Sequence, residues 1–158
     1  MVDFFEQTEK LIGKIITDII YIWISFEDDS SANDLIGMLF HFKDQRVLFR
    51  ANGDFDIIDM DFLDENTHWK ERYEFEETLG IVSCRDSLIK DGFVGKKVWY
   101  IWKCENTEGF IDSIDFAIGD LVFPNLKLYC AASTLYVFSI SEMGYSHFNK
   151  FKKAQTDS

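Results

Sequence analysis

The sequence predicts an α+β fold: a mainly antiparallel, curved β-sheet with one or two helices, in a single domain that spans residues 1–158. One domain of 158 residues buries roughly 70% of its unfolded surface and needs no disulfide to hold it together. Runs rich in β-branched and aromatic residues predict strands, and the whole chain contains sixteen Phe. The connections between these runs are short and hairpin-like, which favours antiparallel pairing.

The first elements are a helix, a long strand and a loop. Apolar side chains recur at helical spacing over residues 3–12, and Gly13 ends that helix. The stretch from Lys14 to Phe26 is dense in Ile, Tyr, Trp and Phe, which favours a strand. Residues 27–34 (EDDSSAND) combine turn formers with acids, so we expect a solvated loop there.

Turn chemistry then predicts three consecutive strands. The segments Leu35–Lys43 and Arg46–Ala51 flank a short polar turn and form a hairpin. The Asn-Gly pair at residues 52–53 is a second tight-turn signal, after which Phe55–Leu63 runs back as the third strand.

This third strand carries aspartates spaced two, three, two and three residues apart, from Asp54 to Asp64. A two-residue repeat with one extra residue, at Ile57 and Ile58, is typical of a bulged strand. We therefore expect most of the carboxylates to share the solvent face. The core side is then formed by Phe55, Ile57 or Ile58, Met60 and Phe62.

The middle of the chain has weaker signals. Residues 64–77 are polar and aromatic without a clean period, which indicates a loop with a short strand at Arg72–Glu76. Apolar positions between Leu79 and Lys90 fit a helix.

The last third predicts two hairpins. The strands Gly95–Lys103 and Phe110–Ile118 surround a four-residue loop in which Gly109 supplies a positive φ. Two further strands and a frayed tail complete the chain: Leu126–Ala132, Leu135–Ile140 and residues 149–158.

The net charge of −12 limits the partners of the protein. Such a charge repels nucleic-acid phosphates and anionic lipid headgroups, so we expect no direct binding to nucleic acid or membrane. A basic protein or a cation remains compatible with it.

The cysteines and the N-terminus indicate the compartment. Three cysteines are an odd number without a CxxC motif, and we expect all of them to be reduced and buried in a cytoplasmic protein: Cys84, Cys104 and Cys130. The N-terminus MVDFFEQTEK lacks the basic start and apolar run of a secretory signal.

The acidity is concentrated between Asp54 and Glu77, where ten carboxylates face only Lys70 and Arg72. This stretch is either an acidic strand edge that prevents edge-to-edge aggregation or a surface that binds a basic partner. A calcium loop is disfavoured because Asp59 occupies the position where an EF-hand needs glycine. The candidate partner-binding residues are Asp54, Asp56, Asp59, Asp61, Asp64, Glu65, Glu71 and Glu74.

No catalytic or cofactor-binding set is visible in the sequence. The three histidines are far apart, and the only GKK run lacks the preceding glycine of a phosphate-binding loop. The paired carboxylates Asp112 and Asp115 lie on an outer strand face, where we expect solvent to keep their pKa values ordinary. We therefore expect no enzyme activity, metal or cofactor.

Aromatic residues gather on the later strands: Trp99, Tyr100, Trp102, Tyr129, Tyr136 and Phe138. They either pack into the core and a second layer or present an aromatic surface to a partner, where Trp and Tyr are common.

The C-terminal pattern GKKVWYIWKCENTEGFIDSIDFAIGD, followed by LKLYCAASTLYVFSIS, resembles a little-studied family of small bacterial proteins, with motifs that carry no catalytic residue. In size, acidity, cysteine usage and aromatic β-structure, the whole chain is similar to immunity proteins of bacterial toxin–immunity pairs, including contact-dependent growth inhibition systems. This resemblance implies a cytosolic antidote that binds a cognate toxin domain, often a basic nuclease, and blocks its active site.

The expected function is therefore toxin neutralisation by the acidic stretch, which would occupy the basic cleft where a nuclease holds phosphates. The alternative is a small-ligand binding module, without catalytic activity, whose sheet encloses a pocket lined by Phe, Trp and Tyr.

Overall fold

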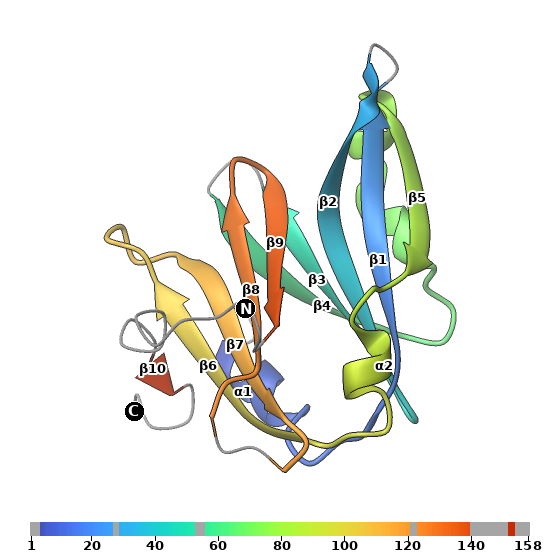
Figure 1. Cartoon of the computed structure of the whole chain (residues 1–158). Coiled ribbons are helices and arrows are strands. Elements are labelled where there is room, and N and C mark those ends of the chain that lie inside the picture. The colour runs from blue at the N-terminus through green and yellow to red at the C-terminus, as the bar shows by residue number, and fades with distance from the viewer. Residues whose placement is uncertain (1–3, 27–28, 53–55, 121–122, 140–151, 154–158) are drawn as a thin grey trace.

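The computed structural model describes residues 4–26, 29–52, 56–120, 123–139 and 152–153. It confirms the α+β class: two antiparallel five-stranded sheets with two short helices form a single domain (Figure 1). The strands divide into two sheets that share one core, where the sequence predicted one curved sheet.

The first sheet is built from the N-terminal half of the chain. Its strand order is β4-β3-β2-β1-β5, with every pair antiparallel. The helix α1 (Phe4–Glu9) precedes it, and the chain leaves that helix through Gly13 at a φ of +88°. The strands are β1 (Ile16–Phe26), β2 (Asp29–Phe42), β3 (Arg46–Asn52), β4 (Ile57–Leu63) and β5 (Ile81–Asp86).

The second sheet has the order β10-β6-β7-β8-β9. Gly109 has a φ of +86° in the hairpin loop between β6 and β7, which confirms the predicted turn. The helix α2 (Lys90–Phe93) leads into this sheet. The strands are β6 (Val98–Glu105), β7 (Ile111–Ile118), β8 (Leu126–Ala131), β9 (Thr134–Ser139) and β10 (Lys152–Lys153).

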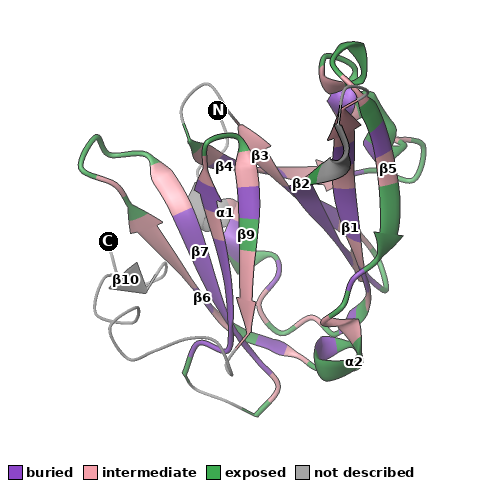
Figure 2. Ribbon diagram, turned by 45° about the horizontal axis from the view of Figure 1, so that its top comes forward, coloured by how far each residue is buried: buried purple, intermediate pink, exposed green. Residues whose placement is uncertain are grey.

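The shared core lies between the two sheets, with buried residues along both β1 and β7 (Figure 2). Three phenylalanines from both sheets meet at its centre: the ring centroid of Phe40 lies 5.3 Å from that of Phe49 and 5.4 Å from that of Phe116. Phe49 and Phe116 are 5.4 Å apart in an edge-to-face arrangement. Such pairs stabilise a core beyond the area that they bury.

A second apolar cluster lies on the opposite face of the first sheet. Because side chains alternate along a strand, Leu39 and Leu48 point away from the main core and contact this cluster. Two 3₁₀-helices, η1 (Trp69–Tyr73) and η2 (Glu76–Thr78), lie in the segment that follows β4, and η1 contributes Trp69 and Tyr73 to the cluster.

Three predictions about the middle of the chain are wrong. Strand β2 begins at Asp29, so the predicted loop 27–34 is paired with β1 from that residue onward, while residues 27–28 lie outside the description. The predicted loop 64–77 with a strand at Arg72–Glu76 contains η1 and η2. Residues 81–86 of the predicted helix between Leu79 and Lys90 instead form β5, because pairing with the free edge of β1 overrides a weak helical period.

Two smaller predictions also need correction. Lys152 and Lys153 pair with Lys103 and Trp102 of β6, so this part of the tail 149–158 is a strand, and its other residues lie outside the description. The cysteines are free thiols as expected, but only Cys130 is buried. Cys84, on the edge strand β5, is exposed.

Candidate functional site

Strand β4 places the predicted acidic row. Its register with β3 runs without interruption from Ile57 opposite Asn52 to Leu63 opposite Arg46, so the predicted bulge is wrong. Regular alternation therefore puts Asp59 and Asp61 on the outer face of the first sheet. The core side is formed as predicted by Ile58 and Met60, with Phe62 packed against them, while Phe55 lies outside the description.

Asp59 and Asp61 are neutralised from within the molecule. The Arg50 guanidinium lies 3.6 Å from the Asp59 carboxylate and 3.5 Å from that of Asp61, and Arg72 lies 3.9 Å from Asp61. Arg50 also donates a hydrogen bond of 2.8 Å to the Arg72 carbonyl oxygen. These two carboxylates therefore help to hold η1 on the sheet and have little charge left for a partner.

Asp56 and Asp64 are also used internally. The Asp56 carboxylate accepts a hydrogen bond of 2.8 Å from the Ala132 N–H, which joins the first sheet to the β8–β9 turn. Asp64 accepts from the Thr67 hydroxyl at 2.7 Å and from the Asn66 N–H at 2.9 Å. These hydrogen bonds, that from Thr67 first, lower the pKa of Asp64. Both carboxylates therefore hold neighbouring chain segments in place and are not free to bind a partner.

Glu65, Glu71 and Glu74 remain as unpaired predicted residues. Each is exposed, and none of their carboxylates has a hydrogen bond or ion pair to another residue in the part of the chain that the structure describes. Asp54 lies outside the described residues. Of the described candidate partner-binding residues, the structure therefore leaves only three glutamates, which lie before, within and after η1, without an internal partner.

Exposed apolar side chains that were not predicted from the sequence follow Glu71 and Glu74 along the chain. Phe75 is 70% exposed, Leu79 is 54% exposed and Ile81 is 62% exposed. We call Glu71, Glu74, Phe75, Leu79 and Ile81 the η2 surface. The available signal was that Phe75 stands inside the acidic stretch and that Leu79 and Ile81 follow it without a clear period.

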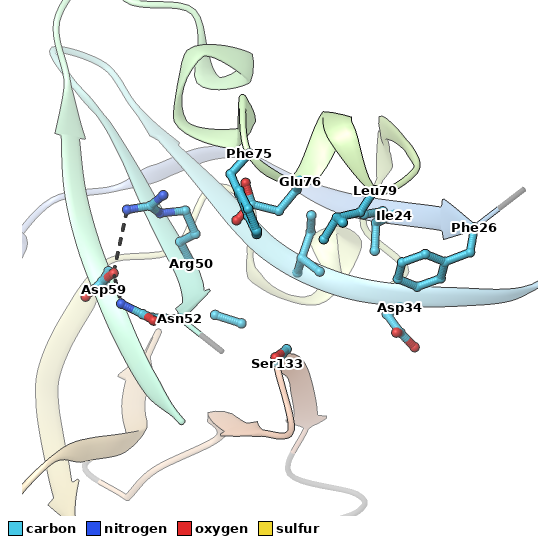
Figure 3. A pocket seen from close by; sticks show the side chains of 12 residues that line it. Ile24, Phe26, Asp34, Arg50, Asn52, Asp59, Phe75, Glu76, Leu79 and Ser133 are labelled. Carbon is cyan, nitrogen blue, oxygen red and sulfur yellow. Dashed lines mark hydrogen bonds and ion pairs between the residues drawn. The ribbon is translucent and has the colours of Figure 1, made fainter. Parts of the chain in front are cut away.

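A hollow of about 300 Å³ opens beside this surface (Figure 3). Its walls come from the C-terminal ends of β1 and β3, from β2 and β4, from the η2 segment and from the β8–β9 turn. Ile24, Ile36 and Leu79 are among its apolar lining residues, and Asp34 and Glu76 are among its acids. We refer to this feature as the hollow.

The aromatic residues of the second sheet lie away from the hollow. Tyr100 and Trp102 pack at 5.8 Å between ring centroids, and Tyr129 and Tyr136 at 6.3 Å. Trp99 is exposed and lies under the Lys97 ammonium at 5.0 Å. The aromatic lining of the hollow comes from Phe residues alone.

Asp115 contradicts the prediction of an exposed carboxylate. It lies on β7 between Trp102 and Lys127 on the neighbouring strands, and its exposed fraction is 0%. Neither carboxylate oxygen has a hydrogen-bond partner among the described residues. Burial raises the pKa of Asp115 to about 7, and Lys127 opposes that rise. Burial likewise raises the pKa of the half-buried Asp112.

The turn between β8 and β9 borders the hollow through Ser133 and has an unusual backbone. Ala132 and Ser133 have φ values of 51° and 66°, a region that favours Asn and Gly. We expect Ala132→Asn and Ser133→Gly each to raise the free energy of unfolding by about 1 kcal/mol, measured by urea denaturation. Thr134→Gly, at the first residue of β9, should instead lower the free energy of unfolding. A loss of stability in the turn variants would contradict this account.

Two kinds of site are not found among the described residues. They contain no group of three or more His, Cys, Asp or Glu side chains that could hold a metal ion. None of the described helices is long and apolar enough to cross a membrane.

Comparison with known proteins places the chain by family. No curated protein and no solved structure matches it. A family model described as "Family of unknown function (DUF6334)" matches residues 1–144. This match covers most of the chain, which therefore belongs to the DUF6334 family.

Proposed function

We propose that this protein is a cytosolic immunity protein that binds a cognate bacterial toxin domain, a basic nuclease, and covers its active site without catalysing a reaction. The observation that carries the proposal is the η2 surface, where unpaired carboxylates adjoin exposed apolar side chains. Interfaces that bind tightly combine an apolar centre with a charged rim.

The apolar part of the η2 surface would supply most of the binding energy. Phe75, Leu79 and Ile81 are large side chains that water surrounds in the free protein. Burial of apolar area is favourable by roughly 25 cal/mol per Å² before the costs of association. Clustered exposed apolar residues beside charged ones mark interaction sites more often than isolated ones do.

The acidic part would select and attract the partner. The net charge of −12 favours encounter with a basic protein. Glu71 and Glu74 place free carboxylates beside Phe75 along the chain, and Glu65 adds a third exposed carboxylate before η1. Long-range attraction of this kind speeds association and weakens as salt screens it. In the bound state the carboxylates would lie where the nuclease holds phosphates.

Charge reversal at the three free glutamates tests this proposal. We expect Glu65→Lys, Glu71→Lys and Glu74→Lys together to weaken inhibition of the toxin domain encoded beside the gene at least tenfold, mainly through slower association. Nuclease assays and association rates at two salt concentrations measure the effect. Reversal of Asp56, Asp59 or Asp61 is less informative because these residues hold the backbone and Arg50.

A matched control separates local from total charge. Asp91→Lys, Glu108→Lys and Asp120→Lys change exposed acids elsewhere. Each set adds six charges, three reversals of two units, and takes the net charge from −12 to −6. If both sets of variants lose inhibition equally, the total charge of the protein explains the effect and the η2 surface does not. If the glutamate variant inhibits the toxin domain as well as the native protein does, the three glutamates do not take part in binding.

The hollow favours a second candidate function, a small-ligand binding module. Its volume of about 300 Å³ is at the lower end of ligand sites, which extend from roughly 300 to 1,000 Å³. A metabolite that raises the melting temperature in a ligand screen, together with failure to capture any toxin domain, would favour this candidate.

A further inference from the structure

Apolar side chains line the hollow on two sides, so a long alkyl chain would fit between them. Ile24 and Ile36 line it from neighbouring strands β1 and β2, and Leu79 and Phe75 line it from the η2 segment (Figure 3). Leu79 and Phe75 also belong to the η2 surface, so one partner segment can cover the surface and enter the hollow. An inserted chain would contact apolar atoms on two sides.

The charges of the hollow are unbalanced. Arg50 is occupied by Asp59 and Asp61, so it is not free to bind an anion. Asp34 and Glu76 also line the hollow, and neither carboxylate has a hydrogen bond or ion pair to any other described residue. Three acids and one arginine give this site a net charge of −2.

We propose that the hollow receives a lysine or arginine side chain of the bound toxin, a step that rests on the proposed function. Lys and Arg bury their aliphatic stems along apolar walls and keep the charged group at a polar rim. The stem would lie between Ile24, Ile36 and Leu79, and the cation would lie at the rim beside Asp34 or Glu76. A neutral apolar group would fit less well because it would desolvate both carboxylates without compensation.

A small probe tests the site without the toxin. We expect Nα-acetyl-arginine amide or Nα-acetyl-lysine amide to shift the NMR methyl signals of Ile24, Ile36 and Leu79 in a saturable way, with millimolar affinity. Nα-acetyl-citrulline amide has the same shape as the arginine probe but no charge, and should bind at least fivefold more weakly. Equal binding of the charged and neutral probes would overturn the proposal.

Neutral variants of the two carboxylates identify the groups responsible. Asp34→Asn with Glu76→Gln should weaken probe binding at least fivefold. The matched control, Asp120→Asn with Glu108→Gln, removes the same two charges from exposed positions elsewhere and should leave probe affinity within twofold. Urea denaturation of both variants checks that the fold is intact. Equal probe affinity in the two variants would contradict the assignment of Asp34 and Glu76.

The outcomes also separate this inference from the proposed function. If the toxin domain is inhibited equally by the native protein and by the Asp34→Asn, Glu76→Gln variant, the hollow is not the contact and the proposed function stands. If the charged probe binds through Asp34 and Glu76 but no toxin domain is inhibited, the site for a cation stands and the proposed function falls.

Discussion

Replacement of Gly37 by alanine is expected to lower the free energy of unfolding by about 3 kcal/mol, at the upper end of the usual cost of overpacking. A Cβ atom at Gly37 would lie 2.0 Å from the Tyr73 hydroxyl oxygen and 3.3 Å from its Cζ. Tyr73 is fully buried and donates a hydrogen bond of 3.3 Å to the Ile36 carbonyl oxygen, so its ring has little freedom to withdraw. Urea denaturation measures the loss.

A double variant isolates this contact. Tyr73→Phe removes the hydroxyl and should cost about 1 kcal/mol alone, the usual value of one hydrogen bond. Gly37→Ala combined with Tyr73→Phe should be more stable than Gly37→Ala, although the Leu48 side chain stays close to the new methyl group, at 3.4 Å. If the two costs simply add, or Gly37→Ala is as stable as the native protein, the steric account is wrong.

The same substitution has a functional consequence. Tyr73 is the last residue of η1, and Glu74 and Phe75 of the η2 surface follow it directly along the chain. A displaced Tyr73 should therefore shift Glu74 and Phe75, and we expect Gly37→Ala to weaken toxin inhibition more than Thr134→Gly, which lowers stability elsewhere. Inhibition assays at a temperature where both variants stay folded make this comparison.

The second large effect is expected for Asp115→Asn, whose stability relative to the native protein should increase with pH. The pKa of Asp115 rises from 3.8 to about 7 on folding, so the folded protein binds more protons than the unfolded chain between these values. The contribution of Asp115 to the free energy of unfolding of the native protein is therefore fully present below about pH 4 and is lost as the pH rises to about 7. The shift corresponds to roughly 4 kcal/mol.

Unfolding free energies at pH 4, 6 and 8 measure this prediction. The buried amide that Asp115→Asn introduces also lacks hydrogen-bond partners and adds a constant cost, so the informative quantity is the change of the difference between the proteins with pH. Asp120→Asn, which removes a carboxylate at an exposed site, is the matched control. Parallel pH profiles for Asp115→Asn and the native protein would contradict the raised pKa.

Local turn chemistry predicted much of the fold. The turn between β2 and β3 and the loop that ends at Gly109 form where the sequence indicates them, because turn residues act through their own backbone preferences. The predictions failed wherever a distant strand decided the outcome. Asp29–Asp34 and Ile81–Asp86 are strands because β1 offers hydrogen-bonding edges on both sides.

The sequence predicted which stretch of the chain contains the candidate site, but it did not predict which of its carboxylates are paired within the molecule. The acidic stretch does contain the free glutamates Glu65, Glu71 and Glu74, but Asp56, Asp59, Asp61 and Asp64 are bound internally. Several of their partners are distant in the chain, as Ala132 is from Asp56, so no local pattern could reveal them. The exposure of Phe75 and Leu79 likewise depends on how η1 and η2 lie over the sheet.

The sequence by itself determined the class of the fold, its antiparallel hairpins and the acidic character of one stretch, because these depend on neighbours within a few residues and on composition. The tertiary structure alone decided the division into two sheets, the burial of Asp115 and the pairing of Arg50 with Asp59 and Asp61. Desolvation and ion pairing depend on groups that folding brings together from distant parts of the chain.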